Sequence, residues 1–145
     1  MSITYNKAVV FMMTGRLDEA ETYLRDAAAY SSRTCRRNAY TLGTIERNPL
    51  NLRILNDLGE VMLRKGSVSE AFKFFQRVHQ GLGDSSPGRP SDPQPAQVSL
   101  KLNMGRALTK LGEFSKARVL LEEVISVYTE WWGTGFACLR IPTCV

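Results

Sequence analysis

Apolar residues recur at helical spacing over most of the chain, and the stretches that show this spacing come in pairs. Each stretch gathers its apolar side chains on one face, as a helix packed on one side requires. No segment has the strict alternation of a convincing strand. The pairs are residues 2–15 with 17–28, 49–65 with 68–78, and 98–111 with 114–125. The pattern predicts an all-α fold of three helix-turn-helix hairpins.

A short motif, Gly-x₄-Ala-x₃-[Leu/Phe], links the two helices of every pair. It occurs as Gly15-Ala20-Leu24, Gly66-Ala71-Phe75 and Gly112-Ala117-Leu121. Glycine ends a helix well because it adopts the left-handed conformation without steric cost. Asn48-Pro49 is a typical helix start, with Asn as the cap and Pro in the first turn. The small residues of the motif let two helices approach closely, so we expect Gly59 and Ala71 to share one close contact.

The second unit reads Leu55-x₂-Leu58-Gly59-x₂-Met62, followed by Gly66 and Ala71-x₃-Phe75. It resembles the tetratricopeptide repeat, in which Leu-Gly marks the first helix and Ala-x₃-Phe the second. The glycines that end the first helices are 51 and 46 residues apart, more than the usual period of about 34. Such long units, with Leu-Gly and Pro between them, resemble the kinesin-light-chain subtype.

The resemblance implies a right-handed solenoid over residues 1–133, with units of about 1–33, 49–81 and 95–132. Residues 134–145 lack helical periodicity and are expected to form an irregular tail. The connector at 81–95 is rich in Pro, Gly and Ser and is expected to be an exposed loop. A chain that begins inside a first helix and ends without a polar capping helix looks like a piece of a longer array.

Composition adds little to this picture, since 43% hydrophobic and 23% charged residues are ordinary for a globular domain. Cys35, Cys138 and Cys144 lack paired spacing, and His79 has no ligand partner near it. We therefore expect no disulfide framework, no metal site and no cofactor. The uncharged run at 8–15 is too short to span a bilayer, and no secretory signal precedes it. These features favour a cytoplasmic protein that does not enter a membrane.

Catalytic motifs are missing from the sequence. It contains no Gly-x-Ser-x-Gly and no phosphate-binding Gly-rich loop with Lys. Glu122 and Glu123 are adjacent, so they point in different directions on a helix and cannot form a carboxylate pair. The chain is therefore predicted not to be an enzyme.

The resemblance implies a protein-protein interaction scaffold that holds a peptide or protein partner in the concave groove lined by the first helices. An apolar anchor is expected near the first hairpin, with polar contacts toward the third. A clamp for a terminal carboxylate is not expected, because Asp57 would repel that group and only Asn103 could donate to it. The candidate groove residues are Tyr5, Asn6, Val9, Met12, Met13, Arg53, Asn56, Asp57, Glu60, Arg64, Asn103, Arg106 and Lys110.

Two other functions stay open. The net charge of +5 suggests a nucleic-acid-binding helical repeat. Such repeats read bases with matched polar side chains, and the matching positions here, Tyr5, Asn56 and Leu102, form no code, so nucleic acid is the less favoured partner. The chain could instead be an oligomerising or regulatory segment of a larger signalling or transport protein, self-associating through uncapped repeat ends. In another interpretation of the first hairpin, the patch at Val9, Met12 and Met13 is the place where a missing upstream repeat packs.

Overall fold

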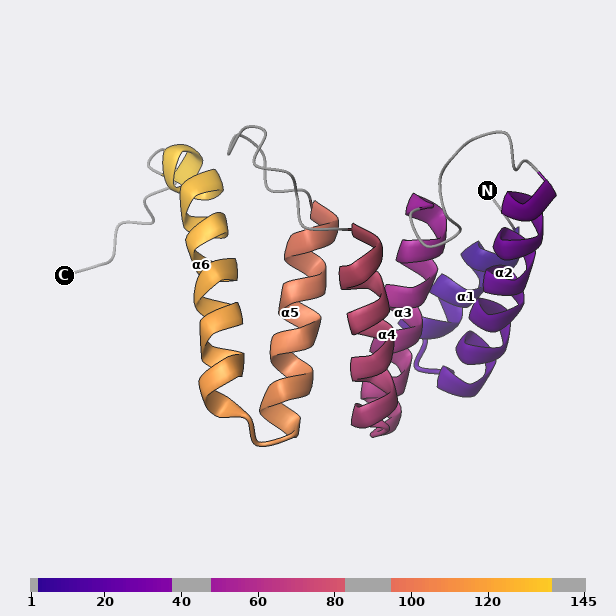
Figure 1. Ribbon diagram of the computed structural model, residues 1–145, viewed down its shortest axis with the longest axis horizontal. Helices are drawn as coiled ribbons and strands as arrows, with labels where there is room; N and C mark the ends of the chain where they lie inside the picture. Colours follow the sequence, from indigo (N-terminus) through magenta and orange to yellow (C-terminus); the bar gives the residue numbers. More distant parts are fainter. Residues whose placement is uncertain (1–2, 38–47, 83–94, 137–145) are drawn as a thin grey trace. The chain divides into compact units, whose positions relative to one another are not determined.

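A computed structural model describes residues 3–37, 48–82 and 95–136 of the chain (Figure 1). Its helices are α1 (Ile3–Met13), α2 (Leu17–Arg37), α3 (Pro49–Lys65), α4 (Val68–Leu82), α5 (Pro95–Lys110) and α6 (Phe114–Phe136). The described residues contain no strand, which confirms the all-α prediction. Helix α2 runs past the predicted unit end at residue 33. Helix α6 includes residues 134–136 of the expected tail, while 137–145 and most of the predicted loop at 81–95 lie outside the described residues.

Three identical turns connect the helices within the hairpins. Gly15, Gly66 and Gly112 adopt φ values of 78°, 89° and 82°, in the left-handed region predicted for them. At the end of α3, the Gly66 N–H donates to the carbonyl of Leu63 and the Ser67 N–H to that of Met62, at 3.3 and 2.9 Å. This Schellman arrangement satisfies carbonyls at the helix end that have no partner inside the helix. The repeated motif therefore encodes a repeated turn.

The start of α3 also follows the sequence prediction. The side-chain oxygen of Asn48 accepts a hydrogen bond from the Leu50 N–H at 2.9 Å, and Pro49 occupies the first turn. Proline costs nothing there because the N–H that it lacks would have no partner within the helix. Arg64 and Lys65 lie in the last turn, where positive charge complements the helix dipole.

The chain forms two compact units, Met1–Pro90 and Ser91–Val145. In the first unit α1 packs on α2, α3 packs on α4, and α2 contacts α3, so two hairpins stack on each other. In the second unit α5 packs on α6. The alanines of the motif, Ala20, Ala71 and Ala117, are buried in their hairpins. The repeated small residues are thus part of the core.

A close helix approach in the second hairpin joins Gly59 of α3 to Phe75 of α4. A Cβ atom added at Gly59 would overlap the Phe75 ring, so Phe75, one turn after Ala71 in the motif, is the nearest neighbour of Gly59. In the third hairpin a Cβ atom at Gly105 would lie 2.8 Å from Cδ2 of Leu121. In the second and third hairpins the motif therefore sets a large residue of the second helix against a glycine of the first.

Candidate functional site

Helix α3 docks onto α1 through side chains that the sequence analysis assigned to the groove. The Tyr5 hydroxyl donates a hydrogen bond to Oδ2 of Asp57 at 2.7 Å. The Arg53 guanidinium lies 5.6 Å from the centroid of the Tyr5 ring, within the range of a cation–π contact. Further along, Nη1 of Arg64 donates to the Met12 carbonyl at 2.9 Å. The first helices of the two hairpins are therefore held side by side.

Burial controls the electrostatics of this contact. Desolvation raises the pKa of the Tyr5 hydroxyl well above its usual value, and the hydrogen bond to Asp57 and the charge of Asp57 act in the same direction. Desolvation also raises the pKa of Asp57, and the nearby Glu60 adds to the rise, although the bond from Tyr5 and the charge of Arg53 oppose it. The Tyr5 hydroxyl therefore remains a proton donor across the ordinary pH range.

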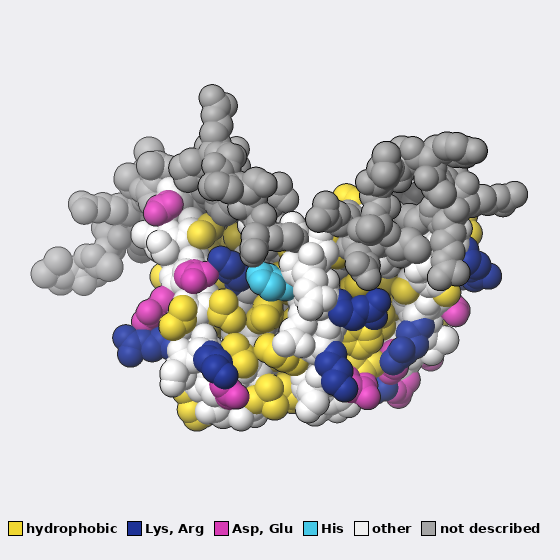
Figure 2. All heavy atoms as spheres, viewed as in Figure 1, with side chains coloured by type: hydrophobic (Ala, Val, Ile, Leu, Met, Phe, Trp, Pro, Cys, Tyr) yellow, Lys and Arg dark blue, Asp and Glu magenta, His cyan; other side chains and the backbone are white. Residues whose placement is uncertain are grey.

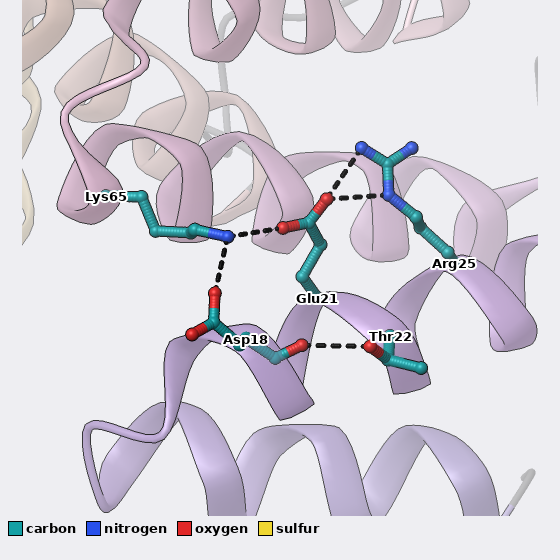
Figure 3. A network of polar contacts seen from close by, with 5 residues as sticks. All are labelled: Asp18, Glu21, Thr22, Arg25 and Lys65. Atoms are coloured by element: carbon teal, nitrogen blue, oxygen red, sulfur yellow. Dashed lines mark hydrogen bonds and ion pairs between the residues drawn. The ribbon is translucent and has the colours of Figure 1, made fainter.

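A second polar contact joins α3 to α2 (Figure 3). Nζ of Lys65 lies 2.7 Å from Oδ1 of Asp18 and 2.8 Å from Oε2 of Glu21. The other carboxylate oxygen of Glu21 accepts from Nε of Arg25 at 2.8 Å. The hydrogen bond from Lys65 is the largest cause that holds the pKa of Glu21 below its usual value. The network fixes the C-terminal end of α3 against the start of α2.

The predicted apolar anchor on α1 is divided by the fold. Tyr5 and Met12 are buried, so their side chains serve the packing of the hairpins. Val9 is half-buried, whereas Asn6 and Met13 are exposed, Met13 at 83%. Only Val9 and Met13 of the apolar candidates therefore remain accessible to a partner. The sequence missed this division because α1 is apolar on more than one face.

The candidates on α3 form an accessible strip. Arg53 and Arg64 are exposed, and Asn56, Asp57 and Glu60 are half-buried. Nη2 of Arg64 also pairs with Oε1 of Glu60 at 2.6 Å. Because α3 docks on α1, the accessible candidates of α1, Val9 and Met13, are counted as part of the same strip. The strip combines both signs of charge with an amide.

The candidates on α5 belong to the second unit and behave differently from one another. Arg106 and Lys110 are exposed, whereas Asn103 is buried and already engaged in an interaction. The prediction that Asn103 offers hydrogen bonds to a partner therefore does not fit its position. A polar residue on an amphipathic helix is predicted from the sequence to be exposed. The burial of Asn103 becomes visible only in the packed structure.

A groove between α2 and α4 is a feature that the sequence analysis missed. One hollow of about 370 Å³ is lined by Arg25, Ala28, Ser32, Asn51, Leu55, Leu58, Phe74 and Arg77. A second, of about 350 Å³, shares Arg25, Phe74 and Arg77 with it, so the two adjoin. The position of Phe74 in the sequence is the feature from which this groove could have been predicted. Phe74 precedes the core residue Phe75, and because neighbouring residues of a helix diverge by about 100°, it must face another direction.

The described residues hold no cluster of His, Cys, Asp and Glu suited to a metal ion. Within the same ranges, no helix is long and apolar enough to cross a bilayer.

Comparison with known protein families gives two matches. Models of the tetratricopeptide repeat match residues 37–90, which contain α3 and α4, and residues 99–130, which contain most of α5 and α6. No curated protein and no solved structure matches the chain. The two matched segments together span more than half of the chain, and each contains one of the hairpins and glycine turns described above. The chain therefore belongs to the tetratricopeptide repeat superfamily.

Proposed function

We propose that the chain is a non-catalytic scaffold that binds a peptide or protein partner along the exposed strip of its first helices. Tetratricopeptide repeats generally mediate protein–protein interactions, and two matches to that family support the proposal. The long spacing between its turns favours the kinesin-light-chain subtype, and a cytoplasmic location accords with that assignment. Self-association through exposed repeat ends stays a second route to a partner.

The observation that carries the proposal is the continuity of the strip across α1 and α3. The bond from Tyr5 to Asp57 and the bond from Arg64 to the Met12 carbonyl hold the two helices together through contacts within the chain. A partner therefore meets a surface that is already formed, which lowers the entropic cost of binding. Met13 would contact an apolar residue of the partner, while Arg53 and Asn56 would contact its polar groups.

Selection of peptides from a random library against the full chain tests the proposal. Peptides that bind through the strip should lose about tenfold or more in affinity on Arg53→Glu, because the change reverses a charge beside the binding path. Arg118→Glu on α6 is a matched control, since Arg118 is exposed and lies outside the strip. If the selected peptides bind the Arg53→Glu and Met13→Ser variants as tightly as the parent chain, the strip is not the binding site.

A further inference from the structure

We infer that the groove between α2 and α4 is a second interaction site, one that accepts an acidic peptide segment with an apolar residue at its centre. This site goes beyond the proposed function because it uses a different face of α3. The inference rests on three observations, namely an apolar floor, a surround of positive charge, and a position on the far side of α3 from the strip.

The floor of the groove consists of apolar side chains from three helices. Leu55 and Leu58 of α3 lie there with Phe74 of α4 and Ala28 of α2. Leu55 and Leu58 belong to the hairpin core, whereas Phe74 is half-buried and exposes part of its ring. A hollow of about 370 Å³ lies at the lower end of the size of small-molecule pockets. It has room for one apolar side chain of a partner.

Positive charge surrounds this floor. Arg25, Lys73 and Arg77 line the two adjoining hollows, with Glu70 as the only carboxylate among the lining residues described. Lys73 and Arg77 are exposed and form no ion pair with any described residue. Arg25 pairs with Glu21 at 2.8 Å, yet 53% of its side chain stays exposed. On the face seen in Figure 2, dark-blue basic side chains flank yellow apolar ones in the region of these helices.

The groove and the strip lie on opposite sides of α3. At about 100° per residue, Asn51, Leu55 and Leu58 fall on one side of the helix. Arg53, Asn56, Glu60 and Arg64 fall on the other side, about half a turn away. A ligand in the groove and a ligand on the strip would not compete for the same side chains of α3. Variants of the two sites therefore give independent readouts.

The charge balance identifies the partner. Carboxylates of Asp or Glu complement guanidinium and ammonium groups, and Arg binds them in a bidentate manner. The apolar floor favours a peptide over a nucleic acid, because a phosphate backbone would gain nothing from contact with Leu55, Leu58 and Phe74. The expected ligand is a short segment in which a Leu or Phe is flanked by acidic residues.

Fluorescence anisotropy with the full chain tests this assignment. The probe is a labelled peptide in which a central Phe is flanked by Glu and Asp, and the comparison peptide carries Gln and Asn at the acidic positions. We expect the acidic probe to bind at least about tenfold more tightly, with an affinity that falls as salt rises. The double variant Lys73→Glu/Arg77→Glu should weaken its binding by a similar factor and remain helical by circular dichroism.

Arg53→Glu is the matched control, since it reverses a charge on the strip and Arg53 is not among the residues that line the groove. Full binding of the acidic probe to this variant, with loss in the groove variant, supports the second site. Loss in Arg53→Glu alone assigns the probe to the strip and overturns the inference, as does equal binding of the Gln and Asn peptide. Tighter binding of a random single-stranded RNA, lost in the groove variant, would make the groove a nucleic-acid site instead.

Discussion

Helices α1 and α3 occupy the same place in consecutive hairpins, yet the same positions meet different surroundings in them. Counted from the glycine that ends each helix, Ile3 corresponds to Ile54 and Val10 to Val61. Ile3 is 76% exposed and Ile54 1%, while Val10 is 58% exposed and Val61 0%. The residue types agree, so composition does not explain the difference.

The difference comes from what each helix has to pack against. Helix α3 packs between α4 and the hairpin of α1 and α2, so its side chains are covered on two sides. Helix α1 packs mainly on α2, and its opposite face carries Ile3, Val10 and Met13 at the surface. Burial in a repeat protein is therefore a property of the neighbour as much as of the residue, as expected when each unit contacts only adjacent units.

Truncation of the paired isoleucines gives the largest expected effect. Ile54→Ala should cost about 2–5 kcal/mol, because it removes buried methyl groups and leaves a cavity between hairpins. Ile3→Ala should change stability by no more than about 0.5 kcal/mol, since it acts at an exposed site. Urea unfolding of both variants, followed by circular dichroism, measures the two values. Similar losses would mean that Ile3 is also covered, for instance by a second copy of the chain, and dilution would then reveal a dependence on concentration.

The glycine contact of the second hairpin gives the next largest effect. Gly59→Ala should cost about 1–3 kcal/mol despite the better helix propensity of Ala, because the new Cβ atom would overlap the Phe75 ring. The first hairpin shows the compatible alternative, with Ala8 at the equivalent position and the smaller Leu24 at that of Phe75.

The double variant Gly59→Ala/Phe75→Leu copies that pair into the second hairpin. It should recover part of the loss caused by Gly59→Ala, and a double-mutant cycle by chemical denaturation measures the coupling. Strictly additive effects of the two substitutions would show that Gly59 and Phe75 do not constrain each other.

The turns and the hairpin cores could be predicted from the sequence because their causes are local. A glycine seven residues beyond Ala8, Gly59 or Gly105 ends each first helix, and the helical periodicity marks the buried face. The candidate site was predicted less well. The Met12 carbonyl accepts from Arg64 of α3, which lies 52 positions further along the chain, and no local pattern records that contact. The groove between α2 and α4 arises in the same way, from helices of different hairpins.

A fall in pH should have opposite effects on the two contacts that hold α3 in place, the one with Glu21 and the one with Asp57. Because the pKa of Glu21 is lowered from 4.5, its contribution to stability is present above that value and lost as the pH falls below it. Because the pKa of Asp57 is raised from 3.8, the folded state binds its proton more tightly, and this carboxyl destabilises the fold as the pH rises above 3.8. Glu21→Gln should therefore flatten the loss of stability in acid, whereas Asp57→Asn should steepen it. Urea midpoints between about pH 3 and pH 7 test both signs, and equal profiles for the two variants would contradict them.

Loss of the Lys65 ion pairs should have the smallest effect on stability. The first hairpin has no lysine at the equivalent position of α1, so the contact is specific to α3. Lys65 reaches Asp18 and Glu21 of the preceding hairpin, whereas the corresponding residue of α1 is Thr14, whose hydroxyl bonds back to the Val10 carbonyl. Lys65→Met keeps most of the aliphatic stem and removes the charge, so only the ionic part of the contact is lost. Exposed ion pairs contribute little and are screened by salt, and we expect a small drop in melting temperature at low salt that disappears at high salt. Arg118→Met, which breaks a pair within the single helix α6, is the control for loss of an exposed charge. A drop for Lys65→Met that persists at high salt would show that the stem of Lys65 packs between the hairpins, and that its charge is incidental to their docking.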